Sequence, residues 1–149
     1  MKAQGCAISF AWLLFLFPAC VWAEYSQGEV ARAIRQAGGL ENFLLHIIRQ
    51  TNKQTPVRLD ENFELMMATL PTPRSIGYNT KIQRHTLSDI KNKAALKHIM
   101  FERSVNVLCT SPVSSVLLGR YGVSYLYNVY SMTGEYVFDY EIRMKDCQK

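Results

Sequence analysis

Acid–base or metal chemistry in this chain would have to begin with its three histidines, His46, His85 and His98. No two of them stand four residues apart around a glutamate, which is the spacing that places zinc ligands on one helix face. His46 falls on the polar side of an expected helix, His85 in a loop, and His98 at the boundary of a helical core face. Ordinary structural positions account for all three, so the sequence predicts no bound metal.

Carboxylates offer a second route to chemistry. They form two groups on or beside expected strands: Asp60, Glu61 and Glu64, and Asp139 and Glu141. One hypothesis is a hydrolase in which Asp60, Glu64 or Asp139 works with His98. Charges that face solvent and discourage edge-to-edge pairing of strands are a commoner reason for such residues. We therefore predict no catalytic residues and expect that the protein is not an enzyme.

Nucleophile and cofactor motifs do not change this expectation. Ser114 and Ser115 lack the flanking glycines of a nucleophile elbow, and the segment 119–122, GRYG, is too short for a phosphate-binding loop. We expect no cofactor. The net charge is +5, and the cations are spread along the chain without a run of three. A nucleic-acid partner would favour a clustered basic patch, so none is expected.

The first 23 residues have the layout of a secretory signal. Lys2 precedes an apolar run from Ala7 to Phe17, and small residues lead to Ala23. The run is too short to cross a bilayer as a helix. The sequence therefore predicts cleavage after Ala23 and a mature chain of residues 24–149 forming a single domain. The alternative is a lipoprotein anchored through Cys20.

Cleavage would leave Cys109 and Cys147 as the remaining cysteines of the mature chain. An exported chain with two cysteines is expected to pair them, because its compartment is oxidising. A zinc site would need more ligands, and a redox pair would have the Cys-x-x-Cys spacing. We predict a structural disulfide between Cys109 and Cys147.

The elements that must position these residues follow from hydrophobic periodicity. Apolar residues at helical spacing predict helices over residues 40–52 and 88–108, with a short helix after Pro112. Alternation predicts strands over residues 57–67, 76–82, 123–129 and 136–142. The predicted order is α-β-β-α-α-β-β. We expect an α+β fold with a four-stranded antiparallel sheet, made of two ββ pairs, packed against helices.

Tyrosines crowd the last predicted hairpin. Alternation places Tyr125 and Tyr127 on the inner face of the first strand, and it groups Tyr136 with Phe138, Tyr140 and Ile142 on the inner face of the second. Tyr130 and Leu126 stand at the alternate positions of the first strand, so their side chains are expected on the opposite face of the sheet. Exposed aromatic residues are enriched at protein interfaces. We therefore predict a protein-binding surface that includes Tyr130, Leu126 and Tyr121.

A family resemblance supports this outline. The residues that carry it are Asn52-Lys53-Gln54, Pro56, Asp60, Tyr78, Cys109-Thr110-Ser111-Pro112, Leu117-Leu118, Gly122-Val123-Ser124-Tyr125, Tyr127, Gly134 and Cys147. Over residues 40–147 the chain resembles small exported bacterial proteins similar to the quorum-sensing-regulated virulence factor of pseudomonads. The resemblance implies an α+β fold, export and a structural disulfide, and it brings no catalytic residues. Arg120-Tyr121 before Gly122 departs from the family's pattern.

These observations favour a small periplasmic or secreted protein that acts by binding an unknown protein partner in the cell envelope or outside the cell. A connection to virulence is implied by the family resemblance alone. No transmembrane segment is expected in the mature chain. One alternative is an accessory, pilotin-like component of a secretion or pilus system. The hydrolase remains the other alternative.

Overall fold

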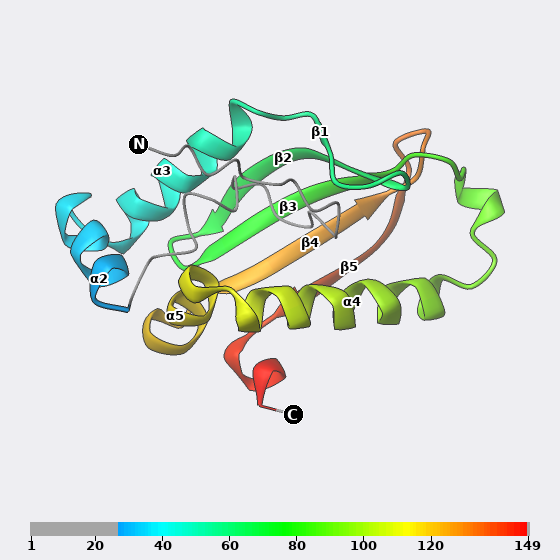
Figure 1. The fold of residues 1–149 in the computed structure, drawn as a ribbon. Helices are drawn as coiled ribbons and strands as arrows, with labels where there is room; N and C mark the ends of the chain where they lie inside the picture. The colour runs from blue at the N-terminus through cyan, green and yellow to red at the C-terminus, as the bar shows by residue number, and fades with distance from the viewer. Residues whose placement is uncertain (1–26, 149) are drawn as a thin grey trace, which may run out of the picture.

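The fold is described from a computed structural model that places residues 27–148 (Figure 1). The predicted signal segment, the cleavage after Ala23 and the lipid site at Cys20 lie outside these residues, so they remain predictions. Between residues 27 and 148, no helix combines the length and the apolar character that a membrane span requires.

Two helices begin the described chain. α2 (Gln27–Gln36) and α3 (Leu40–Asn52) are joined at Gly38 and Gly39, whose φ angles are 81° and 125°. Glycine adopts these positive values without the steric cost that a Cβ would add, so the chain reverses sharply here. α3 confirms the predicted helix over residues 40–52, and it buries Phe43, Leu44, Ile47, Ile48 and Thr51.

The sheet has five strands, not the predicted four. They are β1 (Val57–Arg58), β2 (Phe63–Thr72), β3 (Ser75–Ile82), β4 (Ser124–Tyr130) and β5 (Tyr136–Ile142), arranged side by side in chain order. The prediction of an entirely antiparallel sheet is also wrong, because β3 pairs with β4 in parallel while the other neighbours are antiparallel.

The parallel pairing follows from the connection between β3 and β4. After β3 the chain forms a 3₁₀ turn, η1 (Leu87–Asp89), and then α4 (Lys93–Thr110) and α5 (Pro112–Tyr121). These helices carry it back to the end of the sheet where β3 began (Figure 1). Parallel neighbours need such a helical crossover, whereas antiparallel neighbours can be joined by a tight turn.

The extra strand arises from a turn inside the predicted strand 57–67. The side chain of Asp60 accepts hydrogen bonds from the backbone N–H groups of Asn62 and Phe63, at 2.7 and 2.8 Å. The chain reverses around Asp60, so that Val57 pairs with Leu65. Glu61, which breaks the hydrophobic alternation of this segment, lies in the turn.

The long helix predicted over residues 88–108 is interrupted. Thr86 and Asp89 form a capping box, in which the Thr86 N–H donates to Asp89 Oδ2 at 2.8 Å, but it caps only η1. A new helix starts after Asn92, whose Oδ1 accepts from the Ala95 N–H at 2.9 Å. α4 therefore begins at Lys93. The predicted short helix is confirmed as α5, and it ends at Gly122 with a φ of 63°.

One hydrophobic core fills the space between the sheet and the helices. It joins buried residues of α2, α3 and α5, and Leu108 of α4, with one face of β2–β5. At its centre lie tyrosine rings of β3, β4 and β5. Tyr127 and Tyr140 stack with centroids 4.8 Å apart, and the rings of Tyr78 and Tyr127 are tilted to each other with centroids 5.4 Å apart. The Tyr140 hydroxyl lies 3.0 Å from the Ser104 hydroxyl of α4. The inner-face tyrosines are thus part of the core.

Candidate functional site

The residues proposed for a hydrolase do not gather in the structure. The Asp60 carboxylate accepts hydrogen bonds from backbone N–H groups of its own turn, and Glu64 forms an ion pair with Lys81 at 3.3 Å. Asp139 is exposed on β5, on the face of the sheet opposite the core. His98 is exposed on α4, not at a core boundary as predicted, because only the last turns of α4 pack closely on the body of the protein. Glu64 and Asp139 therefore lie on the face of the sheet opposite the core, whereas His98 lies on α4.

His46 and His85 are both exposed, on α3 and in the loop before η1. Within residues 27–148, no cluster of three or more histidine, cysteine, aspartate or glutamate side chains has a geometry that could hold a metal ion. Ser114 and Ser115 are half-buried in the first turn of α5, where the Ser111 side chain caps the helix. Their positions are explained by the start of that helix.

The sheet has a second face that no described helix covers, which we call the open face. The register places these side chains on it: Glu64, Met67, Asn79, Lys81, Leu126, Asn128, Tyr130, Tyr136, Asp139 and Glu141. None of them belongs to the hydrophobic core. At its centre Asn128 Nδ2 donates to Asn79 Oδ1 across the parallel pair at 2.9 Å. The open face is thus an ordered, partly polar surface.

An aromatic pair occupies one end of the open face. Tyr130 of β4 and Tyr136 of β5 are partners in the register, with ring centroids 6.2 Å apart in an edge-to-face arrangement. The Tyr136 side chain is 52% exposed. The prediction that Tyr136 shares the inner face with Phe138 is wrong, because a β-bulge at Val137 adds one residue to β5 and reverses the side of Tyr136.

The predicted interaction residues therefore fall in two places. Tyr130 and Leu126 lie on the open face, half-buried, as their parity suggests. Tyr121 belongs to the last turn of α5, where its ring packs against the core and lies 5.9 Å from the Arg120 guanidinium. The sequence does not indicate that Tyr136 belongs to the open face, because residues that alternate regularly give no sign of a β-bulge. The Gly134 turn that precedes it gives no sign of the added residue.

At the opposite end of the open face lies a cavity of about 690 Å³, which we call the basal groove. It is bounded by the β2–β3 turn, the end of α5, the start of β4 and the chain after β5. Its walls include Pro71, Arg74, Leu118, Leu126, Glu141 and Lys145. No sequence pattern indicates this groove, because its walls come from four segments that only the fold brings together.

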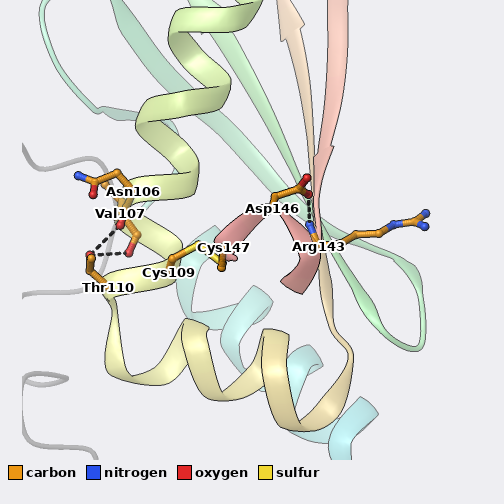
Figure 2. The surroundings of a disulfide bond; sticks show 7 residues. All are labelled: Asn106, Val107, Cys109, Thr110, Arg143, Asp146 and Cys147. Atoms are coloured by element: carbon orange, nitrogen blue, oxygen red, sulfur yellow. Dashed lines mark hydrogen bonds between the residues drawn. A yellow bond between two sulfur atoms is a disulfide. The ribbon is translucent and has the colours of Figure 1, made fainter. Parts of the chain in front are cut away.

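The disulfide fixes one wall of the basal groove. Cys109, near the end of α4, is bonded to Cys147 at the end of η2 (Met144–Cys147), with the Cα atoms 5.6 Å apart (Figure 2). The predicted pairing is therefore confirmed. η2 is also capped, since the Arg143 N–H donates to Asp146 Oδ2 at 2.9 Å. Met144 and Lys145, which line the groove, are held between these two anchors.

Charge in the groove is unevenly balanced. Arg143 Nη2 donates to Glu141 Oε2 at 2.6 Å. This hydrogen bond lowers the pKa of the Glu141 carboxyl, and a hydrogen bond from Ser124 and the charges of Arg143 and Lys145 act in the same direction. Glu141 is therefore ionised and committed to Arg143. Arg74 and Lys145 are exposed on the rim, and neither has an acidic group of residues 27–148 within 4 Å.

A five-stranded mixed sheet with helices on one face is an arrangement that other bacterial proteins share. One is a "putative secreted protein" from Pseudomonas aeruginosa, whose crystal structure matches with a TM-score of 0.60 at 13% identity over 73% of this chain and 93% of that one. No protein-family model and no curated protein matches the sequence.

Two further neighbours are pilotins of type II secretion systems. EpsS from Vibrio vulnificus matches with a TM-score of 0.59 at 14% identity, over 80% of this chain and 98% of that one. AspS from Vibrio cholerae matches with a TM-score of 0.56 at 14% identity, over 78% and 97%. At these identities the likeness shows the fold alone. It agrees with the resemblance to small exported bacterial proteins without showing membership of a family.

Proposed function

We propose that this chain is a cell-envelope protein that works by binding another protein, as a pilotin-like accessory component of a secretion system. The fold is one that two type II pilotins share over nearly their whole length. Binding, rather than chemistry, suits a molecule whose histidines and carboxylates lie apart. The pilotin-like role is an alternative on the sequence alone. The likeness of the fold to pilotins now favours it over a secreted binding protein of unspecified role.

The observation that carries the proposal is the aromatic pair on the open face. Tyr130 and Tyr136 present two rings on a sheet surface that no described helix covers, and Tyr136 is 52% exposed. Met67, on the same face, is 44% exposed. Large exposed apolar side chains gathered on one surface mark interaction sites, and tyrosine contributes much contact area with little loss of conformational freedom.

Capture of a partner from envelope extracts tests the proposal. The purified mature protein is immobilised, and captured proteins are identified by mass spectrometry. We expect a component of a secretion system to be retained by the wild type and lost by the variant Tyr130→Ala/Tyr136→Ala. Ile99→Ala is the matched control, since Ile99 is 47% exposed on α4, away from the open face. Equal capture by all three proteins would contradict a role for the open face.

Membrane attachment is a separate part of the pilotin-like proposal. Two mature forms are compatible with the N-terminal sequence: a free chain beginning at Glu24 and a chain lipidated on Cys20. The intact mass of the protein purified from cells distinguishes them. A lipidated N-terminus at Cys20 would support an anchored accessory, and an unmodified chain starting at Glu24 would leave a free periplasmic or secreted protein.

A further inference from the structure

We propose that the basal groove binds a short acidic segment of a partner protein whose acidic side chains are flanked by apolar ones. This inference rests on the proposed function, because it names the kind of partner sequence that the open face and its groove would receive. The argument depends on the floor of the groove, the charges on its rim and the rigidity of its walls.

The floor of the groove is apolar. Leu118 and Val123 line the groove but are each 1% exposed, so its apolar surface comes mainly from the half-buried Leu126 of β4 and from Pro71 and Met144. Pro71 and Met144 form the sides, and Met144 is 38% exposed. Its volume of about 690 Å³ lies in the range of ligand-binding clefts, and the groove is open to solvent. Such a floor favours apolar side chains over water.

The rim of the groove is cationic. Arg74 stands on the β2–β3 turn, and Arg143 and Lys145 follow β5. One carboxylate, Glu141, lines the same cavity, and it is hydrogen-bonded to Arg143. Arg74 and Lys145 therefore contribute two positive charges without an acidic neighbour within 4 Å among residues 27–148. Carboxylates on a bound segment would complement these charges.

Two cations beside an apolar floor suit a peptide better than a polyanion. Binding to an anionic membrane surface generally involves four to eight clustered basic residues. A nucleic acid would require a longer basic track along its phosphates. A segment with a few acidic residues among apolar ones matches both the two cations without an ion pair in the described part of the chain, Arg74 and Lys145, and the apolar surface of the groove.

The walls of the groove are held in place before any ligand binds. The Ser124 N–H donates to the Arg74 carbonyl at 2.9 Å, which ties the β2–β3 turn to the start of β4. The Thr72 and Ser75 hydroxyls lie 2.8 Å apart within that turn. The disulfide and the Asp146 cap hold η2 on the other side. A preformed site loses little conformational entropy on binding, so the few contacts available contribute to affinity.

The test uses two labelled model peptides. Each has seven residues and capped ends, in the order Ala-Leu-X-Leu-X-Leu-Ala, where X is the acidic residue or its amide counterpart. One carries glutamates and the other carries glutamines. Fluorescence anisotropy with the mature protein at low salt should show tighter binding of the glutamate peptide, by about fivefold or more. This preference should shrink as salt screens the charges.

Variants locate the preference. Arg74→Gln/Lys145→Gln should reduce it to less than about twofold, and both side chains are exposed, so folding should be unaffected. Lys93→Gln/Lys97→Gln on α4 is the matched control, because it removes the same charge from exposed residues outside the groove. Equal binding of the two peptides by the wild type, or an equal loss in both double variants, would overturn the inference.

Two further outcomes separate this inference from the proposed function. Displacement of the glutamate peptide by the same concentration of inorganic phosphate would show recognition of an anion alone and would overturn the proposed peptide ligand. Capture of a secretion component that depends on Tyr130 and Tyr136 but persists in Arg74→Gln/Lys145→Gln would keep the proposed function and remove the acidic segment from the groove.

Discussion

The side chain of Asn52 completes the hydrogen bonding of Ala68 as another strand would. Asn52 Nδ2 donates to the Ala68 carbonyl at 2.8 Å, and the Ala68 N–H donates to Asn52 Oδ1 at 2.7 Å. β1 pairs with β2 only at Leu65 and Glu64, so it ends before it reaches Ala68. The last residue of α3 thus occupies the edge of the sheet where β1 is missing.

Replacing Asn52 by alanine should destabilise the protein. Two backbone groups of a half-buried strand edge would lose their partners, at a cost of about 1–3 kcal/mol. Urea denaturation followed by circular dichroism measures the change. Asn42→Ala, at an exposed position of the same helix, should leave stability unchanged or slightly raised. Equal midpoints for the two variants would show that the Asn52 contacts do not contribute.

Gly77 should not tolerate a larger residue. A Cβ at this position on β3 would overlap Thr69 Oγ1 and lie 3.0 Å from Pro71 Cγ. We expect Gly77→Ala to lower the free energy of unfolding by about 1–3 kcal/mol, as crowding of a packed site does. Thr69→Ala should cost less in the Gly77→Ala background than in the wild type. Purely additive effects of the two substitutions would exclude a clash between them.

Loss of the disulfide should reduce stability substantially. Cys109 and Cys147 are 38 residues apart, and the chain-entropy treatment of such a loop gives about 4 kcal/mol. We expect Cys109→Ser/Cys147→Ser to lose about 2–4 kcal/mol. Chemical denaturation of the oxidised wild type, the reduced wild type and the double variant measures it. Reduced wild type and double variant should behave alike, and a midpoint equal to that of the oxidised protein would contradict the expectation.

High pH should weaken the fold through the stacked tyrosines. Burial raises the pKa of Tyr140 from 10.0 to about 12, against a smaller opposing effect of its hydrogen bond with Ser104. Below pH 10 the hydroxyl is protonated in both states, so its contribution is constant. Between pH 10 and 12 it ionises first in the unfolded chain, which should lower the free energy of unfolding by up to about 2–3 kcal/mol.

Tyr140→Phe tests this assignment. It removes the ionising hydroxyl, and it also removes the hydrogen bond to Ser104, which should cost about 1 kcal/mol at neutral pH. The decline in stability above pH 10 should therefore be shallower in the variant than in the wild type. Parallel curves from pH 9 to 12, measured by urea denaturation, would show that Tyr140 does not titrate in this way.

Much of the local structure can be predicted from the sequence, because local signals determine it. The apolar spacing of residues 40–52 predicts α3, and Thr86 with Asp89 predicts a capping box. Pro112 marks the start of α5, while its end is indicated only as Gly119 or Gly122, of which the structure has Gly122. The direction of strand pairing carries no such signal, since alternation is the same in parallel and antiparallel neighbours. The reversal at Asp60 was hidden in an almost continuous alternation.

The candidate site was harder to predict than the fold. Parity alone places Leu126 and Tyr130 on the open face, but the bulge at Val137 moves Tyr136 to that face against its parity. The basal groove depends on Arg74, Leu118 and Lys145, which are far apart in the chain and meet only through the helical crossover and the disulfide. Contacts of this kind depend on tertiary structure, which periodicity does not describe.

The parallel pairing of β3 with β4 has a consequence for biogenesis. Synthesis runs from the N-terminus, so β1, β2 and β3 are available while residues 83–123 are still to be made. Until β4 arrives, β3 has one hydrogen-bonding edge without a partner, beside the apolar side chains of Ile76, Tyr78 and Ile82. Such an edge invites aggregation. A nascent or truncated chain that stops short of residue 124 should therefore depend on a chaperone, whereas the finished protein seals that edge within its own sheet.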